Sequence, residues 1–347
     1  MTGRALVARM DNFGDVLLAG PCVRAVAAHV DSVTLLAGPR GRAGADLLPG
    51  VEQVLTWCAP WIDPEPPSVS PASTNAFIDQ IRALDVDLAL ILTSFHQSPL
   101  PLALLLRMAG VPWIGAISDD YPGSLLDLRH RVEGDPPEAE RALSLAESAG
   151  FRLPPGDDGK LAVRQPLSKV GSLTGEPGYV VVHPAASVPA RQPSSSQSAA
   201  IVAALTSAGH RVIVTGAPSD RPLTGAVAGG HAIDLGGATT LPELAAVLRD
   251  ASVVVAPNTG PAHLAAAVGT PVVSLFAPVV PAERWAPYGV PVAMLGDQRA
   301  PCRGSRAREC PVVGHPCLDS ITPDHVVMVA EELGAGRCER LRIGGVS

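Results

Sequence analysis

The strongest constraint on this sequence is a repeated alternation of short apolar runs and longer stretches with helical periodicity. In the first half, four apolar runs predict buried strands, at Leu6–Arg9, Ser32–Leu36, Leu88–Leu92 and Trp113–Ile117. Helices are predicted between them, at Val16–His29, Asn75–Leu84 and Leu100–Ala109. Strands joined by helices pair in parallel through right-handed crossovers, so the pattern predicts an α/β fold with helices on both faces of a parallel sheet.

The alternation is interrupted once, between Leu153 and Pro177, where Pro, Gly, Asp and Lys replace the apolar periodicity. It then restarts with predicted strands at Tyr179–His183, Val212–Thr215, Ala232–Leu235, Val253–Ala256 and Val272–Phe276, and a last helix is predicted at Thr322–Leu333. The 347 residues also correspond to about two domains. We therefore predict two doubly wound domains, at residues 1–165 and 166–335, and a tail at 336–347. Their sheets would face one central cleft, where open α/β sheets bind ligands.

Composition narrows the class of partner. Aromatic residues make up 3% of the chain and the formal net charge is −7, which disfavours nucleic acid, because that partner needs clustered basic residues and stacking platforms. The N-terminus lacks the apolar core of a signal peptide, and no apolar run reaches the length of a membrane helix. We expect a cytoplasmic protein without a transmembrane segment. Contact with a membrane surface stays open.

The first predicted strand leads into the turn Asp11-Asn12-Phe13-Gly14-Asp15. Two carboxylates and an amide at one cleft-facing turn favour a functional role for Asp15. The alternative is helix capping, because an Asp near a helix N-terminus satisfies free backbone N–H groups and the helix dipole.

A second candidate group, Pro257-Asn258-Thr259-Gly260-Pro261-Ala262-His263, follows a predicted buried strand and opens a helix. The free N–H groups of a helix N-terminus bind anions, with a hydroxyl from Thr259 and close backbone approach at Gly260. A diphosphate suits this site. An ordinary N-cap, with His263 as a helix residue in the core, is the alternative.

Two further loops leave predicted strands of the second half. In His183–Arg191, the guanidinium of Arg191 is a candidate for phosphate oxygens, with a solvated surface arginine as the alternative. In Thr215–Asp220, the carboxylate of Asp220 is a candidate for ribose hydroxyls, with simple turn formation as the alternative.

Other motifs give weaker evidence about function. No G-x-G-x-x-G follows the first strand and no P-loop motif occurs, which disfavours a standard dinucleotide fold or a P-loop. Cys302, Cys310 and Cys317 lack the close spacing of zinc sites, so we expect reduced loop cysteines and leave a disulfide or a metal open.

Taken together, these loops resemble glycosyltransferase family 9, best known for ADP-heptose:lipopolysaccharide heptosyltransferases. The resemblance covers nearly the whole chain and is carried by four segments: Arg9-x-Asp11-Asn12-x-Gly14-Asp15-Val16-Leu17-Leu18, His183-Pro184-x-Ala186-Ser187, Asn258-Thr259-Gly260-Pro261-x-His263-Leu264-Ala265, and Phe276-x-Pro278 through Glu283-Arg284-Trp285-x-Pro287-Tyr288-Gly289. It implies the two-domain GT-B architecture, with the acceptor bound by the N-terminal domain and the donor by the C-terminal one.

The resemblance also implies an activity: inverting, metal-independent transfer of a sugar, heptose from ADP-heptose, to an acceptor hydroxyl, with no cofactor. Asp15 matches the catalytic base. The residues that match donor contacts are Ser187, Arg191, Asp220, Asn258, Thr259, Gly260 and His263. Two departures are present, since Asn258 stands where the lipopolysaccharide enzymes usually carry Asp, and Gln192-Pro193 replaces a basic residue and Trp-Pro.

Acceptor contacts are expected from Asn12, His96 and Gln97, at the carboxyl ends of the first-half strands. For His96, capping of the helix near Leu100 is the alternative. The partners are a nucleotide sugar and a glycan, lipid-linked or small-molecule acceptor. Two other functions stay open: a sugar-nucleotide epimerase of the same fold, and a nucleotide-sugar-binding protein without turnover.

Overall fold

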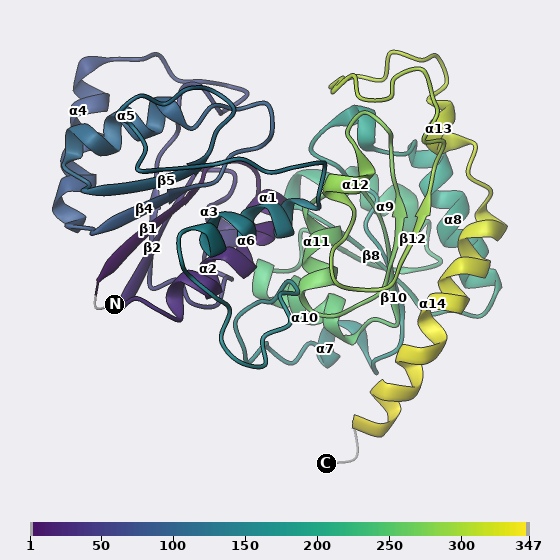
Figure 1. Ribbon diagram of the computed structural model, residues 1–347. Helices are drawn as coiled ribbons and strands as arrows, with labels where there is room; N and C mark the ends of the chain where they lie inside the picture. Colours follow the sequence, from purple (N-terminus) through teal and green to yellow (C-terminus); the bar gives the residue numbers. More distant parts are fainter. Residues whose placement is uncertain (1–2, 345–347) are drawn as a thin grey trace. The chain divides into compact units, whose positions relative to one another are not determined.

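The computed structural model describes residues 3–344 and divides into two compact units, the first ending at Arg164 and the second beginning at Gln165. Each unit contains a six-stranded parallel sheet with helices packed against it (Figure 1). The predicted α/β fold of two doubly wound domains is confirmed.

The first unit has the strand order β3-β2-β1-β4-β5-β6. Its strands are β1 (Arg4–Arg9), β2 (Ser32–Ala37), β3 (Gln53–Thr56), β4 (Leu88–Ile91), β5 (Trp113–Ile117) and β6 (Leu128–His130). Its helices are α1 (Phe13–Leu18), α2 (Gly20–Ala27), α3 (Arg42–Ala45), α4 (Pro71–Leu84), α5 (Leu100–Ala109) and α6 (Glu138–Ser148). β1 is paired in parallel with β2 on one edge and with β4 on the other.

The core of this unit fixes the end of β1. Leu6 and Ala8, both 0% exposed, pack in one apolar cluster with Phe77 and Ile81 of α4 and Leu102 of α5. In Figure 1, α4 and α5 cover one face of the sheet, and α2 and α6 lie on the other. Because β1 is covered on both faces and paired on both edges, the residues at its carboxyl end have well-defined positions.

The second unit has the order β12-β11-β10-β7-β8-β9. Its strands are β7 (Val180–Val182), β8 (Val212–Gly216), β9 (Ile233–Gly236), β10 (Val253–Pro257), β11 (Val272–Leu275) and β12 (Val292–Leu295). Its α-helices are α7 (Gly171–Thr174), α8 (Ser195–Ser207), α9 (Arg221–Ala228), α10 (Leu241–Asp250), α11 (Gly260–Ala267), α12 (Ala282–Trp285), α13 (Pro316–Asp319) and α14 (Pro323–Gly344). Two 3₁₀ turns, η1 (Pro189–Arg191) and η2 (Pro218–Asp220), follow β7 and β8.

Both sheets have the same topological switch point. In the first sheet, β1 and β4 are neighbours, and the chain continues from β1 to β2 on one side and from β4 to β5 on the other. In the second sheet, β7 and β10 are the corresponding neighbours. Ligands of open parallel sheets bind at the carboxyl ends of the two strands that flank the switch point. The loops after β1, β4, β7 and β10 are therefore the places to look for function.

The helix predicted over Val16–His29 is divided into α1 and α2 around Ala19. The physical reason is Pro21, which has no N–H to donate to the carbonyl of Leu17 and so interrupts the helical hydrogen bonds. Three strands, β3, β6 and β12, were not predicted, and neither were the helices α3, α6, α7, α9, α12 and α13.

The last helix, predicted to end at Leu333, continues as α14 to Gly344, and the predicted bounds of the two domains and of the tail at 336–347 stay predictions. Arg337 anchors this extension. Its guanidinium donates to the carbonyls of Ala251 at 2.9 Å and Arg249 at 2.6 Å, and also to that of Gly269. These carbonyls lie in the last turn of α10 or just after the ends of α10 and α11, where helix carbonyls need donors from outside the helix. Residues 345–347 lie outside the described residues.

Within residues 3–344, no helix combines the length and the apolar character needed to cross a bilayer.

Candidate active site

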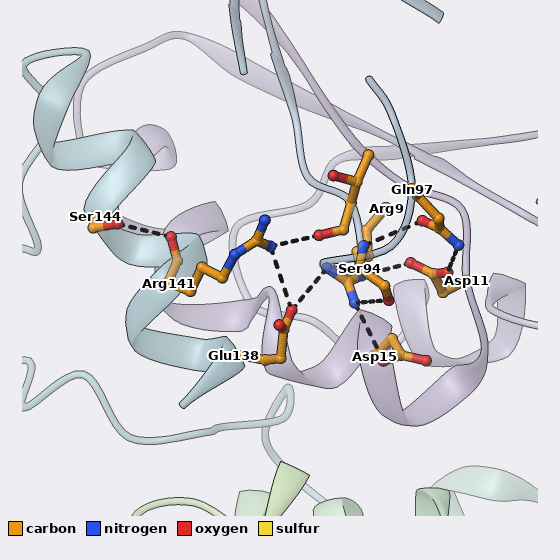
Figure 2. Close-up of polar contacts among 9 residues, drawn as sticks. Arg9, Asp11, Asp15, Ser94, Gln97, Glu138, Arg141 and Ser144 are labelled. Carbon is orange, nitrogen blue, oxygen red and sulfur yellow. Dashed lines mark hydrogen bonds and ion pairs between the residues drawn. The ribbon is translucent and has the colours of Figure 1, made fainter. Parts of the chain in front are cut away.

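A buried ionic cluster occupies the switch point of the first unit (Figure 2). Its centre is Arg9, the last residue of β1, whose side chain is 3% exposed. Arg9 Nε lies 3.0 Å from Asp11 Oδ2, and Arg9 Nη2 lies 3.2 Å from Asp15 Oδ1. Arg9 Nη1 lies 3.4 Å from Glu138 Oε2 at the start of α6. One guanidinium thus contacts three carboxylates.

The loop after β4 joins the same cluster. Ser94 Oγ accepts a hydrogen bond from Arg9 Nη2 at 3.1 Å. Gln97 Nε2 donates to Asp11 Oδ1 at 2.6 Å, and Gln97 Oε1 accepts from the Ser94 N–H at 3.1 Å. Gln97 is therefore used to hold Asp11 and the loop, and its predicted contact with an acceptor stays a prediction.

The backbone after β2 packs closely against the turn that carries the aspartates. A Cβ added to Gly41 would lie 2.8 Å from the carbonyl oxygen of Asp11 and 2.7 Å from Val16 Cγ2. Only a residue without a Cβ fits this approach. Gly41 therefore fixes the turn from the side opposite the loop after β4.

Burial and charge act against each other on the cluster. Burial raises the pKa of Asp11 to about 6, although Arg9 acts to lower it, and the charges of Asp15 and Glu138 add to the rise. Burial also acts to lower the pKa of the Arg9 guanidinium, but the carboxylates outweigh it and the pKa lies above its ordinary value. Arg9 is therefore a permanent cation, and the carboxylates compete for its charge.

Asp15 is the most accessible carboxylate of the three. Its side chain is 17% exposed, against 8% for Asp11 and 1% for Glu138. It is the third residue of α1, whose N-cap is Asn12, and no side-chain hydrogen bond caps that helix. The ion pair with Arg9 favours the catalytic interpretation of Asp15 over simple capping, and its role as a base stays a prediction.

The other predicted acceptor residues are exposed. Asn12 is exposed at the start of α1, and the exposed ring of His96 packs edge-on against Phe95, with centroids 5.3 Å apart. The N-cap of α5 is Pro99, and the Leu100 N–H donates to Ser98 Oγ at 3.4 Å. Pro99 thus occupies the N-cap position of α5, and Ser98 accepts a hydrogen bond from its first N–H.

In the second unit, the loop after β10 places a buried amide beside a helix N-terminus. Asn258 is 5% exposed, and its Nδ2 has no hydrogen-bond partner in the described structure. Thr259 is the N-cap of α11 in an extended conformation, and its side chain makes no capping hydrogen bond. Gly260 begins the helix, and His263 lies one turn in, 4% exposed. Asn258 and Thr259 both have polar atoms available to a ligand.

The loop after β7 contains a neutral histidine. His183 Nδ1 lies 3.0 Å from Thr215 Oγ1 of β8, and burial lowers the pKa of His183 to about 4. Further along, Ser187 is exposed and Arg191 ends η1 with its side chain half-buried. Gln192 Oε1 accepts from the Ala186 N–H at 3.0 Å and closes the loop.

The carboxylate of Asp220 is engaged within its own turn. It accepts from the Ala217 N–H at 2.8 Å and from Ser219 Oγ at 3.3 Å. These contacts agree with the turn interpretation, and the ribose contact stays a prediction. Cys302, Cys310 and Cys317 are free thiols, as expected, and Cys317 lies in the helix α13, not in a loop.

Sequence reasoning missed Glu138 and Arg141. Both are buried in α6, and Arg141 Nη1 donates to the Thr93 carbonyl at 2.5 Å. Glu138 contacts a residue 129 positions away, so no local spacing reveals it. The available signal was the pair of charged residues three positions apart on the apolar face of an amphipathic helix.

Comparison with known proteins identifies the family of the sequence. The sequence model of glycosyltransferase family 9 (heptosyltransferase) matches residues 75–313. Lipopolysaccharide heptosyltransferase 3 of Escherichia coli is 34% identical over 104 residues, and the match spans 28% of this chain and 31% of that relative. This chain thus matches about a third of the length of that curated relative.

Solved structures share the fold over both units. The E. coli ADP-heptose lps heptosyltransferase II superposes with a TM-score of 0.72 at 19% identity, covering 96% of this chain and 99% of that one. The iron-containing dodecameric glycosyltransferase TibC of enterotoxigenic E. coli superposes with a TM-score of 0.51 at 16% identity, covering 96% and 76%. At these identities the likeness concerns the fold.

Two doubly wound units, each with a six-stranded parallel sheet, form the GT-B type of fold that the solved heptosyltransferase structures share. The match over residues 75–313 identifies it further: the chain belongs to glycosyltransferase family 9. The resemblance stated from the sequence is confirmed.

Proposed function

We propose that this protein is an inverting glycosyltransferase that moves a heptose from ADP-heptose to an acceptor hydroxyl. The observation that carries the proposal is the geometry of Asp15, an ionisable carboxylate with partial solvent access at a switch point and paired with a buried cation. The heptosyltransferase description of the family and the ADP-heptose substrate of a protein with the same fold support the donor.

The donor would bind to the second unit. The N-terminus of α11 offers backbone dipoles to a diphosphate, and Thr259 adds a hydroxyl that is not used for capping. Arg191 adds a permanent positive charge in the loop after β7. These groups stabilise the negative charge that develops on the departing nucleoside diphosphate.

Transfer would proceed in a single displacement. Asp15 accepts the proton of the acceptor hydroxyl while that oxygen forms a bond to the anomeric carbon. The bond from the anomeric carbon to the diphosphate oxygen breaks with its electron pair staying on the diphosphate, and the configuration inverts. Because Asp15 and the N-terminus of α11 belong to different units, the proposal requires both units to contact the same pair of substrates.

Asn258 is the candidate for contact with the transferred sugar. Its buried Nδ2 lacks a partner in the described structure, and an orphan amide donor at this depth is satisfied by a ligand hydroxyl or by water. A neutral amide here, in place of the Asp usual in the lipopolysaccharide enzymes, favours a different hydroxyl pattern on the sugar from the one those enzymes bind.

We further propose that transfer needs no metal or other cofactor. The positive charge required at the diphosphate would come from the N-terminus of α11 and from Arg191. The acceptor would be a glycan, lipid-linked or small-molecule hydroxyl, bound by the first unit.

The decisive experiment is product analysis. A panel of nucleoside-diphosphate sugars is first screened by thermal shift, and the stabilising compounds are then incubated with candidate acceptors. A new glycoside with inverted anomeric configuration and free ADP is the expected result. An isomerised sugar nucleotide would indicate the epimerase, and stabilisation without any product would indicate a binding protein.

A further inference from the structure

Glu138 has an unusual position for an acidic residue. It is the first residue of α6 and 1% exposed, and its Oε2 lies 3.4 Å from Arg9 Nη1 and 3.6 Å from Arg141 Nη1 (Figure 2). A buried carboxylate between two guanidiniums is costly to desolvate, and well-packed apolar residues in place of such a whole ionic group often stabilise a core at least as well. Stability alone is therefore a poor reason for this arrangement.

Each arginine that contacts Glu138 also holds a loop at the switch point. Arg141 Nη1 donates to the Thr93 carbonyl at 2.5 Å, and Arg9 Nη2 donates to Ser94 Oγ at 3.1 Å. Arg9 Nη2 also pairs with Asp15. Glu138 thus connects α6 to the loop after β4 and, through Arg9, to the candidate base.

We propose that Glu138 is a positioning residue, which holds Arg9 against Asp15 and sets the charge of the cluster so that Asp15 can act as a base. The proposal rests on the proposed function of Asp15. Glu138 itself touches no substrate in this scheme. Its effect reaches the reaction through the shared guanidinium.

The charged groups around Glu138 determine how its removal would affect Asp15. Five ionic groups face one another: Arg9 from β1, Asp11 from the following turn, Asp15 from α1, and Glu138 and Arg141 from α6. Among these five groups, the carboxylates outnumber the guanidiniums by one. A further titratable neighbour is His130 of β6, whose pKa is lowered by burial and by the nearby Arg141.

Removing the charge of Glu138 would leave two guanidiniums against two carboxylates. Arg9 would then interact more strongly with the aspartates, which ionise more readily when a neighbouring negative charge is removed. Asp15 would become a weaker base, and the acid limb of the kcat profile would move to lower pH. Removing the charge of Arg141 acts in the opposite sense and would move the acid limb to higher pH.

The experiment compares Glu138→Gln, Arg141→Gln and the double variant with the wild-type protein, using the donor and acceptor found by product analysis. Glu147→Gln is the matched control, because Glu147 is exposed on the same helix. For Glu138→Gln we expect kcat to fall about 10- to 100-fold, the size of a small displacement of a catalytic group, with the donor dissociation constant within about twofold of wild type.

The double variant separates electrostatics from simple structural damage, because it restores the excess of one carboxylate over the guanidiniums. We expect it to recover part of the kcat lost in Glu138→Gln and to return the acid limb toward the wild-type position. A double variant with lower kcat than the single one, or single variants whose acid limbs shift in the same direction, would overturn the proposal. So would a Glu138→Gln variant with wild-type kcat and profile.

Folding of each variant is checked by thermal denaturation. If Glu138→Gln fails to fold, Arg141→Gln still tests the direction of the pH shift, and an unshifted acid limb in that variant contradicts the proposal. Failure of the proposed function looks different, since the wild-type protein itself would then transfer no sugar, and the role given to Glu138 would fall with it.

Discussion

Arg9 Nη2 lies 3.2 Å from Asp15 Oδ1, so the candidate base is held by the last residue of the strand that precedes its own helix. The two residues are six positions apart. The backbone of Gly41 lies so close to the turn between them that an added Cβ would be 2.8 Å from the Asp11 carbonyl oxygen. A buried cation thus holds a partly exposed carboxylate beside the carboxyl end of β1.

Asp15→Asn should lower transfer by about 10² to 10⁴-fold, the range expected when a general base is lost. Donor binding should change little, because the donor groups belong to the other unit. Steady-state kinetics and calorimetry with ADP measure the two effects. Asp31→Asn, an exposed aspartate of the same unit, is the control. Turnover above about half of wild type would return Asp15 to a structural role.

Arg191→Ala should weaken ADP and the donor together, by about 1.5–3 kcal/mol for a lost charged hydrogen bond. The reason is that both ligands share the diphosphate. Isothermal titration with ADP is the measurement, and the exposed Arg299→Ala is the matched control. An ADP affinity equal to that of the control would show that Arg191 is a solvated surface arginine that does not contact the diphosphate.

Turnover should persist in excess EDTA, because the positive charge at the diphosphate is supplied by the helix N-terminus and Arg191. The sequence agrees, since no Asp-x-Asp pair follows a predicted strand and the acidic pair Asp119-Asp120 lies in the acceptor half. Initial rates before and after chelation are compared. Loss of activity with recovery on adding Mg²⁺ or Mn²⁺ would contradict the expectation.

His96→Ala should raise the acceptor KM or lower kcat, while the donor dissociation constant measured without acceptor stays fixed. An exposed imidazole on the loop that also carries Gln97 can donate to and accept from sugar hydroxyls. A variant whose donor affinity and melting temperature fall together would indicate a structural role. The acceptor site would then be sought around Asp119, Tyr121 and Arg129.

The burial of His183 should make stability depend on pH. Its pKa is lowered to about 4 in the folded chain, so below pH 6.5 the unfolded chain takes up a proton that the folded chain refuses. Stability is therefore lost as pH falls from 6.5 to about 4, by up to about 3 kcal/mol, and the loss levels off below that. Urea unfolding of wild type and His183→Gln across this range should show a steeper decline in wild type. Parallel declines would rule out this contribution.

The sequence by itself determined the class of fold and the loops that carry the candidate site. Runs such as Trp113–Ile117 and Leu100–Ala109 match β5 and α5 residue for residue, because these elements are specified by their own apolar periodicity. The loops after β1 and β10 follow directly from strands of this kind. Asp15 and Thr259 were therefore found next to the switch points from local order alone.

The tertiary structure decided what local order cannot specify. β6 has the sequence Leu-Arg-His and becomes a strand only through its pairing with β5, so no apolar run announces it. The extension of α14 depends on carbonyls that Arg337 reaches in other helices. The same holds for Glu138, whose contact with Arg9 joins residues 129 positions apart. Periodicity is a property of neighbours in the chain, whereas ion pairing in a core depends on which distant segments the sheet brings together.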